Sequence, residues 1–301
     1  MTKKNGSVRI SLTLLGLTAL VAFPVSAQDD AAAEKRANIE LGLQHDSAWA
    51  LYQTLKEQSD GGERLEWTDL PDWSGLYTRY LATRGAKFDS DQLPGNPPTA
   101  RLTPEYQERL QEKIARAEEG YVYDPLGHCA PATYPRWLTE PFLREFVVTP
   151  DQTWLINELA NEIRRIYTDG RDHFPEEDRY PTADGDSIGF WDGYRLVVHT
   201  NQLTEGEYTR VQPDYTDQVE TVEIWEKVDD GTIEVDVWAY DPGVLAEPWY
   251  VKQTYAKVDN PDKYIRIHYF YCFENPNNDV HETEGGGTQF TDFTFTDEDD
   301  R

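Results

Sequence analysis

One segment of this sequence matches a motif that carries nucleophilic chemistry. Gly185–Gly189 fits G-x-S-x-G, in which Ser187 would be the nucleophile of an α/β-hydrolase. That chemistry needs a strand, a sharp turn and then a helix that helps to form the oxyanion hole. Here the motif runs into an Asp192-Gly193 turn and an apolar strand pattern, and no helical pattern follows. We therefore expect Ser187 to be structural, in a strand that enters a tight hairpin.

An arginine-rich octet, 164–171, offers charged groups that could orient a ligand. Alternation along a strand places Arg165, Tyr167 and Asp169 on one face, and Arg164 on the other. If the first face lines a cavity, Arg165 and Tyr167 could hold an anionic or carbonyl-bearing ligand. The alternative is that these arginines pair with the abundant carboxylates of the chain, as surface charges commonly do.

A predicted hairpin at 223–240 mixes carboxylates with aromatic side chains. Glu223 and Trp225 share one face of its first strand. One face of its second strand carries Glu234, Asp236, Trp238 and Tyr240. Such a surface could bind a ligand or perform acid/base chemistry. The alternative is a solvated face, because antiparallel sheets commonly bury only their other face, here rich in Val and Ile.

Three side chains are the candidates for acid/base catalysis, namely Asp186, His199 and His268. A metal has little support, because His268 and Cys272 lie four residues apart on a predicted strand, about 13 Å, too far to chelate alone. The segment 184–186 lacks the rest of a calcium loop. No glycine-rich phosphate loop or dinucleotide fingerprint occurs, so we expect no metal and no organic cofactor.

The framework that must position these residues is predicted to be β-structure. From Phe142 onward, short runs rich in β-branched and aromatic residues alternate with turn signals. The predicted strands lie at roughly 73–81, 142–149, 153–159, 162–168, 187–191, 194–201, 218–228, 232–240, 249–257 and 263–273. No helical pattern of about 10–15 residues interrupts the series, so we expect no parallel crossovers. The fold class is then all-β, an antiparallel up-and-down, lipocalin-like barrel with short N-terminal helices. A β-sandwich is the alternative.

The N-terminal region predicts export and helices. A basic stretch with Lys3, Lys4 and Arg9 precedes an apolar run at 10–23 and a small-x-small motif at 25–27, as in a secretory signal peptide. We therefore expect the periplasm as the location. Helical spacing is predicted near 47–58 and after Thr103-Pro104. The expected organisation is a signal peptide at 1–27, a helical segment at 28–72, a β-barrel domain at 73–293 and a disordered acidic tail at 294–301.

Charge and cysteine content limit the partners. The net charge of −28 repels phosphate backbones and anionic membranes, so we expect no nucleic-acid partner. No further segment is apolar enough to insert into a membrane. Cys129 and Cys272 are the two cysteines, and an oxidising periplasm favours a disulfide between them. Two free buried thiols are the alternative.

Three motifs occur in order along the chain: Arg-Arg-Ile-Tyr-Thr-Asp-Gly-Arg at 164–171, Ser-Ile-Gly-x-Trp at 187–191 and Cys-x-Glu-Asn at 272–275. They resemble a large family of exported bacterial proteins of similar length, mostly catalogued as hypothetical, over about 73–275. The resemblance implies an organisation but no activity. The chain departs from that pattern at Asp186, Phe190 and His199, where the family pattern has His, Arg and Asp. A site there would have altered polarity.

Two function hypotheses follow. The first is a periplasmic binding protein or carrier for a small hydrophobic or aromatic molecule held in the barrel lumen. The residues expected to contact that ligand are Arg165, Tyr167, Trp191, Trp225, Trp238 and Trp249. The second is a lyase, isomerase or hydrolase that uses the acid/base candidates in the same cavity. An envelope interaction protein without a ligand is a third possibility.

Overall fold

The computed structural model describes residues 25–79, 88–89, 98–122, 124–132, 134–272, 280–282 and 288–290. The chain divides into two compact units, 1–38 and 39–301. Helix α1 (Val25–Leu43) begins in the first unit and supplies all of its described residues. The predicted signal peptide lies outside the described residues up to residue 24, and the predicted acidic tail lies wholly outside them.

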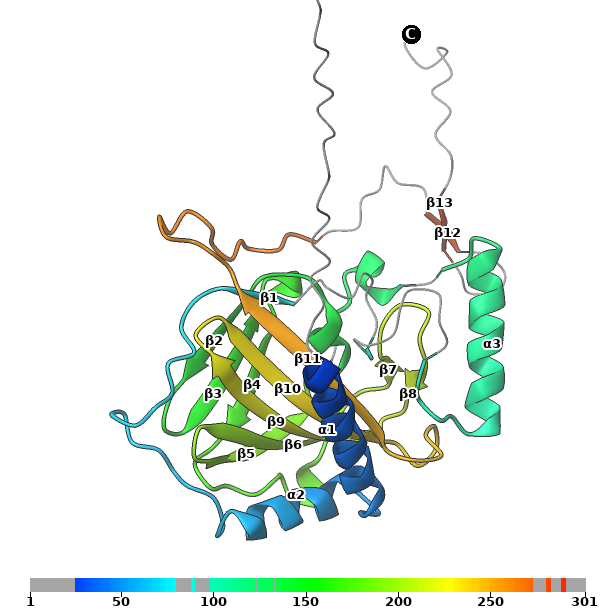
Figure 1. Ribbon diagram of the computed structural model, residues 1–301. Helices are drawn as coiled ribbons and strands as arrows, with labels where there is room; N and C mark the ends of the chain where they lie inside the picture. Colours follow the sequence, from blue (N-terminus) through cyan, green and yellow to red (C-terminus); the bar gives the residue numbers. More distant parts are fainter. Residues whose placement is uncertain are drawn as a thin grey trace, which may run out of the picture. The chain divides into compact units, whose positions relative to one another are not determined.

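The larger unit is built on a closed β-barrel (Figure 1). Its strands, with bounds, are β1 (Tyr77–Arg79), β2 (Arg144–Val148), β3 (Gln152–Asn157), β4 (Ile163–Tyr167), β5 (Asp186–Asp192), β6 (Arg195–Asn201), β9 (Glu220–Asp229), β10 (Thr232–Tyr240) and β11 (Trp249–Lys257). Around the ring their order is β1-β11-β10-β9-β6-β5-β4-β3-β2. The predicted barrel is therefore confirmed. Two short pairs stand apart from it, β7 (Gly206–Glu207) with β8 (Asp214–Tyr215), and β12 (Val280–Glu282) with β13 (Thr288–Phe290).

The prediction of a purely antiparallel, up-and-down barrel was wrong. Strands β4 and β5 run parallel, with Ile166 opposite Ser187 and Tyr167 opposite Ile188. A closed ring with an odd number of strands cannot alternate in direction throughout, so at least one pair in this nine-strand ring has to be parallel. In the crossover between them, 168–185, the one helical element is the 3-10 turn Glu176–Asp178. A search for crossover helices therefore could not detect it.

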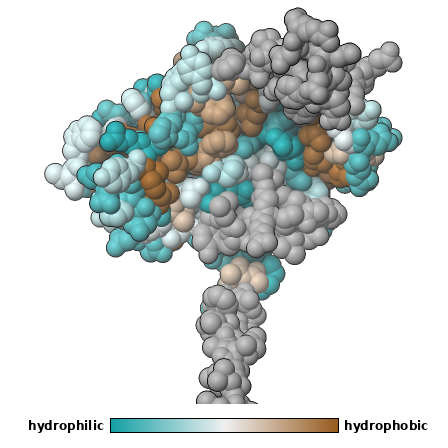
Figure 2. Space-filling model, turned by 90° about the horizontal axis from the view of Figure 1, so that it is seen from above, coloured by the Kyte–Doolittle hydropathy of each residue, from teal (hydrophilic) through white to brown (hydrophobic). Residues whose placement is uncertain are grey.

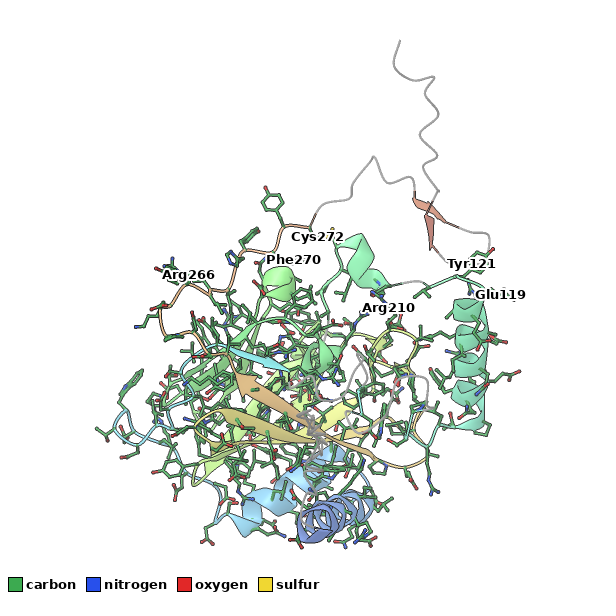
Figure 3. All side chains as sticks on the ribbon, turned by 45° about the horizontal axis from the view of Figure 1, so that its top comes forward. Glu119, Tyr121, Arg210, Arg266, Phe270 and Cys272 are labelled. Carbon is green, nitrogen blue, oxygen red and sulfur yellow. A yellow bond between two sulfur atoms is a disulfide. The ribbon has the colours of Figure 1, made fainter. Side chains whose placement is uncertain are left out.

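The predicted strand at 263–273 was also wrong. Its described residues run outside the barrel without strand pairing (Figure 3). The side-chain amide of Asn161 bonds the backbone of Phe270, donating to its carbonyl at 2.9 Å and accepting from its N–H at 2.8 Å. The barrel already closes through β1 and β2, where Tyr77 is opposite Arg144. No free barrel edge therefore remains for this segment, although its alternation is typical of a strand.

Two helices of the larger unit start where the sequence predicts. Helix α2 (Ala48–Gln58) is capped by Ser47, whose hydroxyl accepts a hydrogen bond from the Ala50 N–H. Its apolar face packs on the outer surface of β6, β9 and β10. Helix α3 (Pro104–Glu118) begins with proline at its first position. No described helix is both long and apolar enough to span a membrane.

Both faces of several barrel strands are consequently buried. One apolar cluster fills the interior and includes Trp191, Trp225 and Val235. A second lies outside, where Leu51 of α2 contacts a cluster containing Val222. On the face seen in Figure 2, hydrophilic residues surround several separate apolar patches, in keeping with the 56 acidic side chains.

A disulfide joins Cys129 to Cys272, as the sequence predicts. The two cysteines are 143 residues apart, so the bond constrains a long loop in the unfolded chain. We expect its removal to lower the free energy of unfolding by about 5 kcal/mol, the chain-entropy value for such a loop. Denaturant titration with and without reductant measures this difference. In a Cys129→Ser/Cys272→Ser control the reductant should have no effect, and identical midpoints for the native protein would contradict the prediction.

Candidate functional site

Four side chains form an unbroken line of hydrogen bonds on the outer surface of the barrel. Asp186 Oδ2 lies 2.7 Å from His173 Nδ1, and His173 Nε2 lies 2.7 Å from His199 Nδ1. His199 Nε2 lies 3.3 Å from Glu220 Oε2. The line thus begins and ends on a carboxylate and passes through both imidazole rings. We call these four residues the relay.

The strand register brings three of the relay residues together. Asp186 begins β5, Glu220 begins β9, and His199 lies near the end of β6. Because these strands are antiparallel neighbours, the starts of β5 and β9 meet the end of β6 at one end of the barrel. Alternation puts their side chains on the outer face. His173 comes from elsewhere, namely the crossover between β4 and β5.

Aromatic rings of α2 cover the relay. The Trp49 ring centroid lies 5.1 Å from that of His199 and 5.9 Å from that of His173, and Tyr52 lies 5.6 Å from His199. Only 1% of the His199 side chain is exposed, whereas 34% of the Glu220 side chain is. The relay therefore connects histidines shielded from solvent under α2 to a carboxylate, Glu220, that solvent or a ligand can reach.

The electrostatics of the relay locate its charge. Burial disfavours ionisation of Asp186, but the hydrogen bond and charge of His173 outweigh it and hold the pKa of Asp186 below its usual value. Burial also opposes ionisation of Glu220, but the hydrogen bond with His199 and the charges of His199, His173 and Arg179 together outweigh it, so the pKa of Glu220 is lowered too. Burial lowers the pKa of His199, although the hydrogen bond to Glu220 acts against this. The buried His199 is therefore an unfavourable place in the relay for an extra proton.

Counting protons shows what the relay can do. Three hydrogen bonds link four ring nitrogens and two carboxylates, and each bond needs one proton. Two neutral imidazoles carry one proton each, so together they supply two of the three. When both carboxylates are ionised, one of the three hydrogen bonds therefore lacks a proton, and two acceptor atoms face each other there. A single added proton completes the line, and it can enter at Glu220 and be passed inward.

Glu220 also forms part of the wall of a groove outside the barrel. The groove has a volume of about 760 Å³, within the range of small-molecule sites. Its lining comes from five segments, 43–47, 179–181, 201–202, 217–220 and 240–248. A ligand in this groove would contact the accessible end of the relay.

The structure brings together two of the predicted catalytic candidates, Asp186 and His199, and separates the third. His268 is exposed on the segment after β11, where its backbone N–H donates to Glu158. The sequence missed His173 and Glu220 as members of the site. His173 lies in a loop, where no periodicity marks it, and Glu220 is one of many acidic residues.

The predicted ligand-binding residues do not gather in a lumen. Arg165 is exposed on the outer face, with its guanidinium over the Trp154 ring, and Tyr167 is half-buried beside Arg171. The predicted tryptophans are buried by packing against other side chains. These are Trp191 against Trp73, Trp225 stacked on Tyr255, Trp249 against Tyr208, and Trp238, outside the barrel, against Tyr250.

The interior instead holds an ion pair from the opposite face of the octet. Arg164 Nη2 lies 2.6 Å from Glu223 Oε1 and Nη1 lies 2.9 Å from Oε2, and both side chains are fully buried. Trp225 Nε1 donates to the same carboxylate at 2.8 Å. The Ser187 hydroxyl accepts from this guanidinium at 3.2 Å. The alternative of a solvated face is therefore wrong at Glu223, which lies inside the barrel and is neutralised by Arg164.

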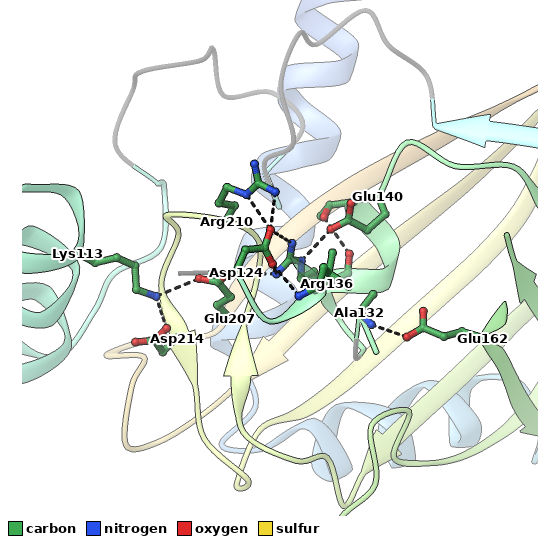
Figure 4. Close-up of polar contacts among 11 residues, drawn as sticks. Lys113, Asp124, Ala132, Arg136, Glu140, Glu162, Glu207, Arg210 and Asp214 are labelled. Carbon is green, nitrogen blue, oxygen red and sulfur yellow. Dashed lines mark hydrogen bonds and ion pairs between the residues drawn. The ribbon is translucent and has the colours of Figure 1, made fainter. Parts of the chain in front are cut away.

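A second charged cluster surrounds Arg136, which is 4% exposed (Figure 4). Its guanidinium contacts Asp124 at 2.9 Å, Glu140 at 2.8 Å and Glu207 at 3.1 Å. Lys113 of α3 contacts Glu207 at 3.2 Å, and so ties that helix to the β7–β8 hairpin. These charges are mutually paired, so we assign this cluster a structural role.

No known family model and no curated protein sequence matches this chain. The resemblance to exported bacterial proteins therefore stays a prediction. Within the described residues, no group of three or more His, Cys, Asp or Glu side chains could hold a metal ion.

The Arg164–Glu223 pair yields a stability prediction. Glu223→Gln should lower the free energy of unfolding by about 3–5 kcal/mol, because it leaves a buried guanidinium without a counter-charge. Replacing both residues by Met should recover most of this loss. Chemical denaturation measures each value. Asp169→Asn, which breaks an exposed pair with Arg171, is the control and should cost less than about 1 kcal/mol. Equal losses for Glu223→Gln and Asp169→Asn would refute the role of burial.

Proposed function

We propose that this protein is an enzyme that moves a proton to or from a small molecule bound in the groove, as a lyase, isomerase or hydrolase. The observation that carries the proposal is the relay, which needs one more proton than two neutral histidines hold and opens onto the groove through Glu220. Glu220 is the candidate catalytic residue. His199 passes the proton, while His173 and Asp186 are positioning residues.

The relay carries away the proton that Glu220 removes, although the same contacts hold the pKa of Glu220 below its usual value. Before reaction, the two histidines are neutral and one hydrogen bond of the line is unmade. When Glu220 takes a proton from the ligand, or from a water molecule that attacks it, this proton completes the line. His199 gives its Nδ1 proton toward His173 and receives one at Nε2 from Glu220. The charge then rests beside Asp186, and the reverse steps return the proton to the product.

Two features favour this proposal over a carrier that holds its ligand in the lumen. The aromatic side chains that such a carrier would use contact one another inside the barrel, as Trp225 and Tyr255 do with ring centroids 5.7 Å apart. The groove lies outside the barrel, and its lining mixes carboxylates with apolar side chains. The disulfide is compatible with an oxidising compartment, so we propose the periplasm as the location.

Glu220→Gln should reduce proton transfer by about 100-fold or more, the usual contribution of a general base. NMR time courses in D2O on a panel of small molecules detect both turnover and exchange of C–H for deuterium. Glu226→Gln, which alters an exposed carboxylate on the same strand, is the matched control and should behave like the native protein. A Glu220→Gln variant as active as the native protein would refute the proposal.

The relay also predicts a pH dependence. The charge of His173 lowers the pKa of Asp186, so by reciprocity Asp186 favours the extra proton in the relay. Activity should rise with pH as this proton leaves, because the base form has one proton fewer. In Asp186→Asn that rise should move to lower pH. Histidine-selective NMR titration reads the same displacement without turnover.

Asp192→Asn at the other end of β5 is the control for this titration and should leave the curve in place. A curve for Asp186→Asn that stays unchanged, or moves to higher pH, would count against a charge held beside Asp186.

A further inference from the structure

The lining of the groove is strongly acidic. Five of its side chains are carboxylates, namely Asp46, Asp217, Glu220, Asp241 and Glu247. Two of these have other partners, since Asp241 accepts hydrogen bonds from Thr216 and Glu247 pairs with Arg101. The His199 hydrogen bond to Glu220 uses Oε2, which leaves Oε1 for a ligand. Asp46 and Asp217 are exposed at the rim.

A buried amide in the groove wall adds an independent observation. Asn201 is only 5% exposed, and its Oδ1 has no hydrogen-bond partner among the described residues. It lies opposite Asp186 in the β5–β6 register and next to the Thr200–Thr221 pair, so it stands between Asp186 and Glu220. Because side chains alternate along a strand, the Asn201 side chain lies on the outer face of the barrel, as the His199 side chain does. A buried carbonyl oxygen without a donor is destabilising, so this position favours a ligand that donates a hydrogen bond.

An ammonium group meets these requirements, because it is a cation with three donors and no acceptor. It can donate to Asn201 Oδ1 and Glu220 Oε1 together while the rim carboxylates attract it. The one guanidinium in the lining, Arg179, is exposed and donates to the carbonyl of Phe174. Gln202 Nε2 is a buried donor without a described partner, and it suits an uncharged oxygen elsewhere on the ligand.

We infer that the groove binds a small amine in its protonated form, with the ammonium between Asn201 and Glu220 and a hydroxyl or carbonyl oxygen near Gln202. The inference rests on the proposed function, because it names the substrate class of the same site. It places the proton that Glu220 removes on, or close to, the carbon that carries the amine.

Three probes with the same five-carbon chain test the charge preference. They are 5-amino-1-pentanol, 1,5-pentanediol and 5-hydroxypentanoate, which are cationic, neutral and anionic at one end. Calorimetric or NMR titration of the full chain near pH 7 should show binding of the amine. The diol should bind about tenfold or more weakly, since it lacks the charge-assisted hydrogen bonds, and the acid should not bind. Binding of the diol or acid as tight as that of the amine, or no binding of the amine, overturns the inference.

Variants outside the relay locate the amine. Asn201→Leu should weaken amine binding by about tenfold and leave the diol unchanged. Asp46→Asn with Asp217→Asn should weaken the amine severalfold and reduce its salt dependence. Glu226→Gln is the control and should change neither. Amine binding that is unaffected by Asn201→Leu and by the rim pair of substitutions refutes the assigned position.

The outcome separates this inference from the proposed function. If the three probes bind alike while Glu220→Gln still abolishes proton transfer, the catalytic proposal stands and the amine preference falls. If the amine is selected but Glu220→Gln leaves proton transfer unchanged, the ligand class stands and the catalytic role of Glu220 falls.

Discussion

The parallel pair of β4 and β5 is the constraint on which the candidate site depends. To run parallel to β4, strand β5 must start at the same end, so the chain has to return along the whole length of the barrel. Without a crossover helix, this return is an irregular surface loop at 168–185. The loop passes the outer face of β5 and β6, and there it delivers His173 between Asp186 and His199. In an even-numbered barrel with hairpin connections, no such loop would be required.

The strand positions could be predicted because alternation and turn residues are local signals. The faces could not, because helix α2 covers the outside of the barrel and both faces of β6 and β9 are buried. Val222, on the face rich in Val and Ile, packs under that helix, while Glu223, on the face expected to be a binding surface or solvated, lies inside against Arg164. Whether a side chain is polar or apolar therefore does not predict whether it lies inside or outside this barrel. That information depends on tertiary contacts between distant segments.

The residues of the candidate site could likewise be predicted only in part. Asp186 and His199 are exceptional residues on predicted strands, so sequence reasoning could select them individually. Their connection depends on the β5–β6 register and on a loop that has no periodic pattern. The predicted aromatic set was selected by residue type alone. Tryptophans such as Trp191 and Trp225 serve as bulk that fills a wide barrel, which is a packing role that composition cannot distinguish from ligand binding.

The contact between Asn161 and Phe270 has a consequence for solubility. The segment after β11 is extended, rich in β-branched and aromatic residues, and exposes Tyr264, Tyr269 and Tyr271. Such a stretch is a template on which a second chain could add a strand and start aggregation. The Asn161 amide occupies the N–H and the carbonyl of Phe270, so the middle of that template is already hydrogen-bonded. The Asn161 side chain thereby removes one residue in the middle of this segment from strand pairing with a second chain.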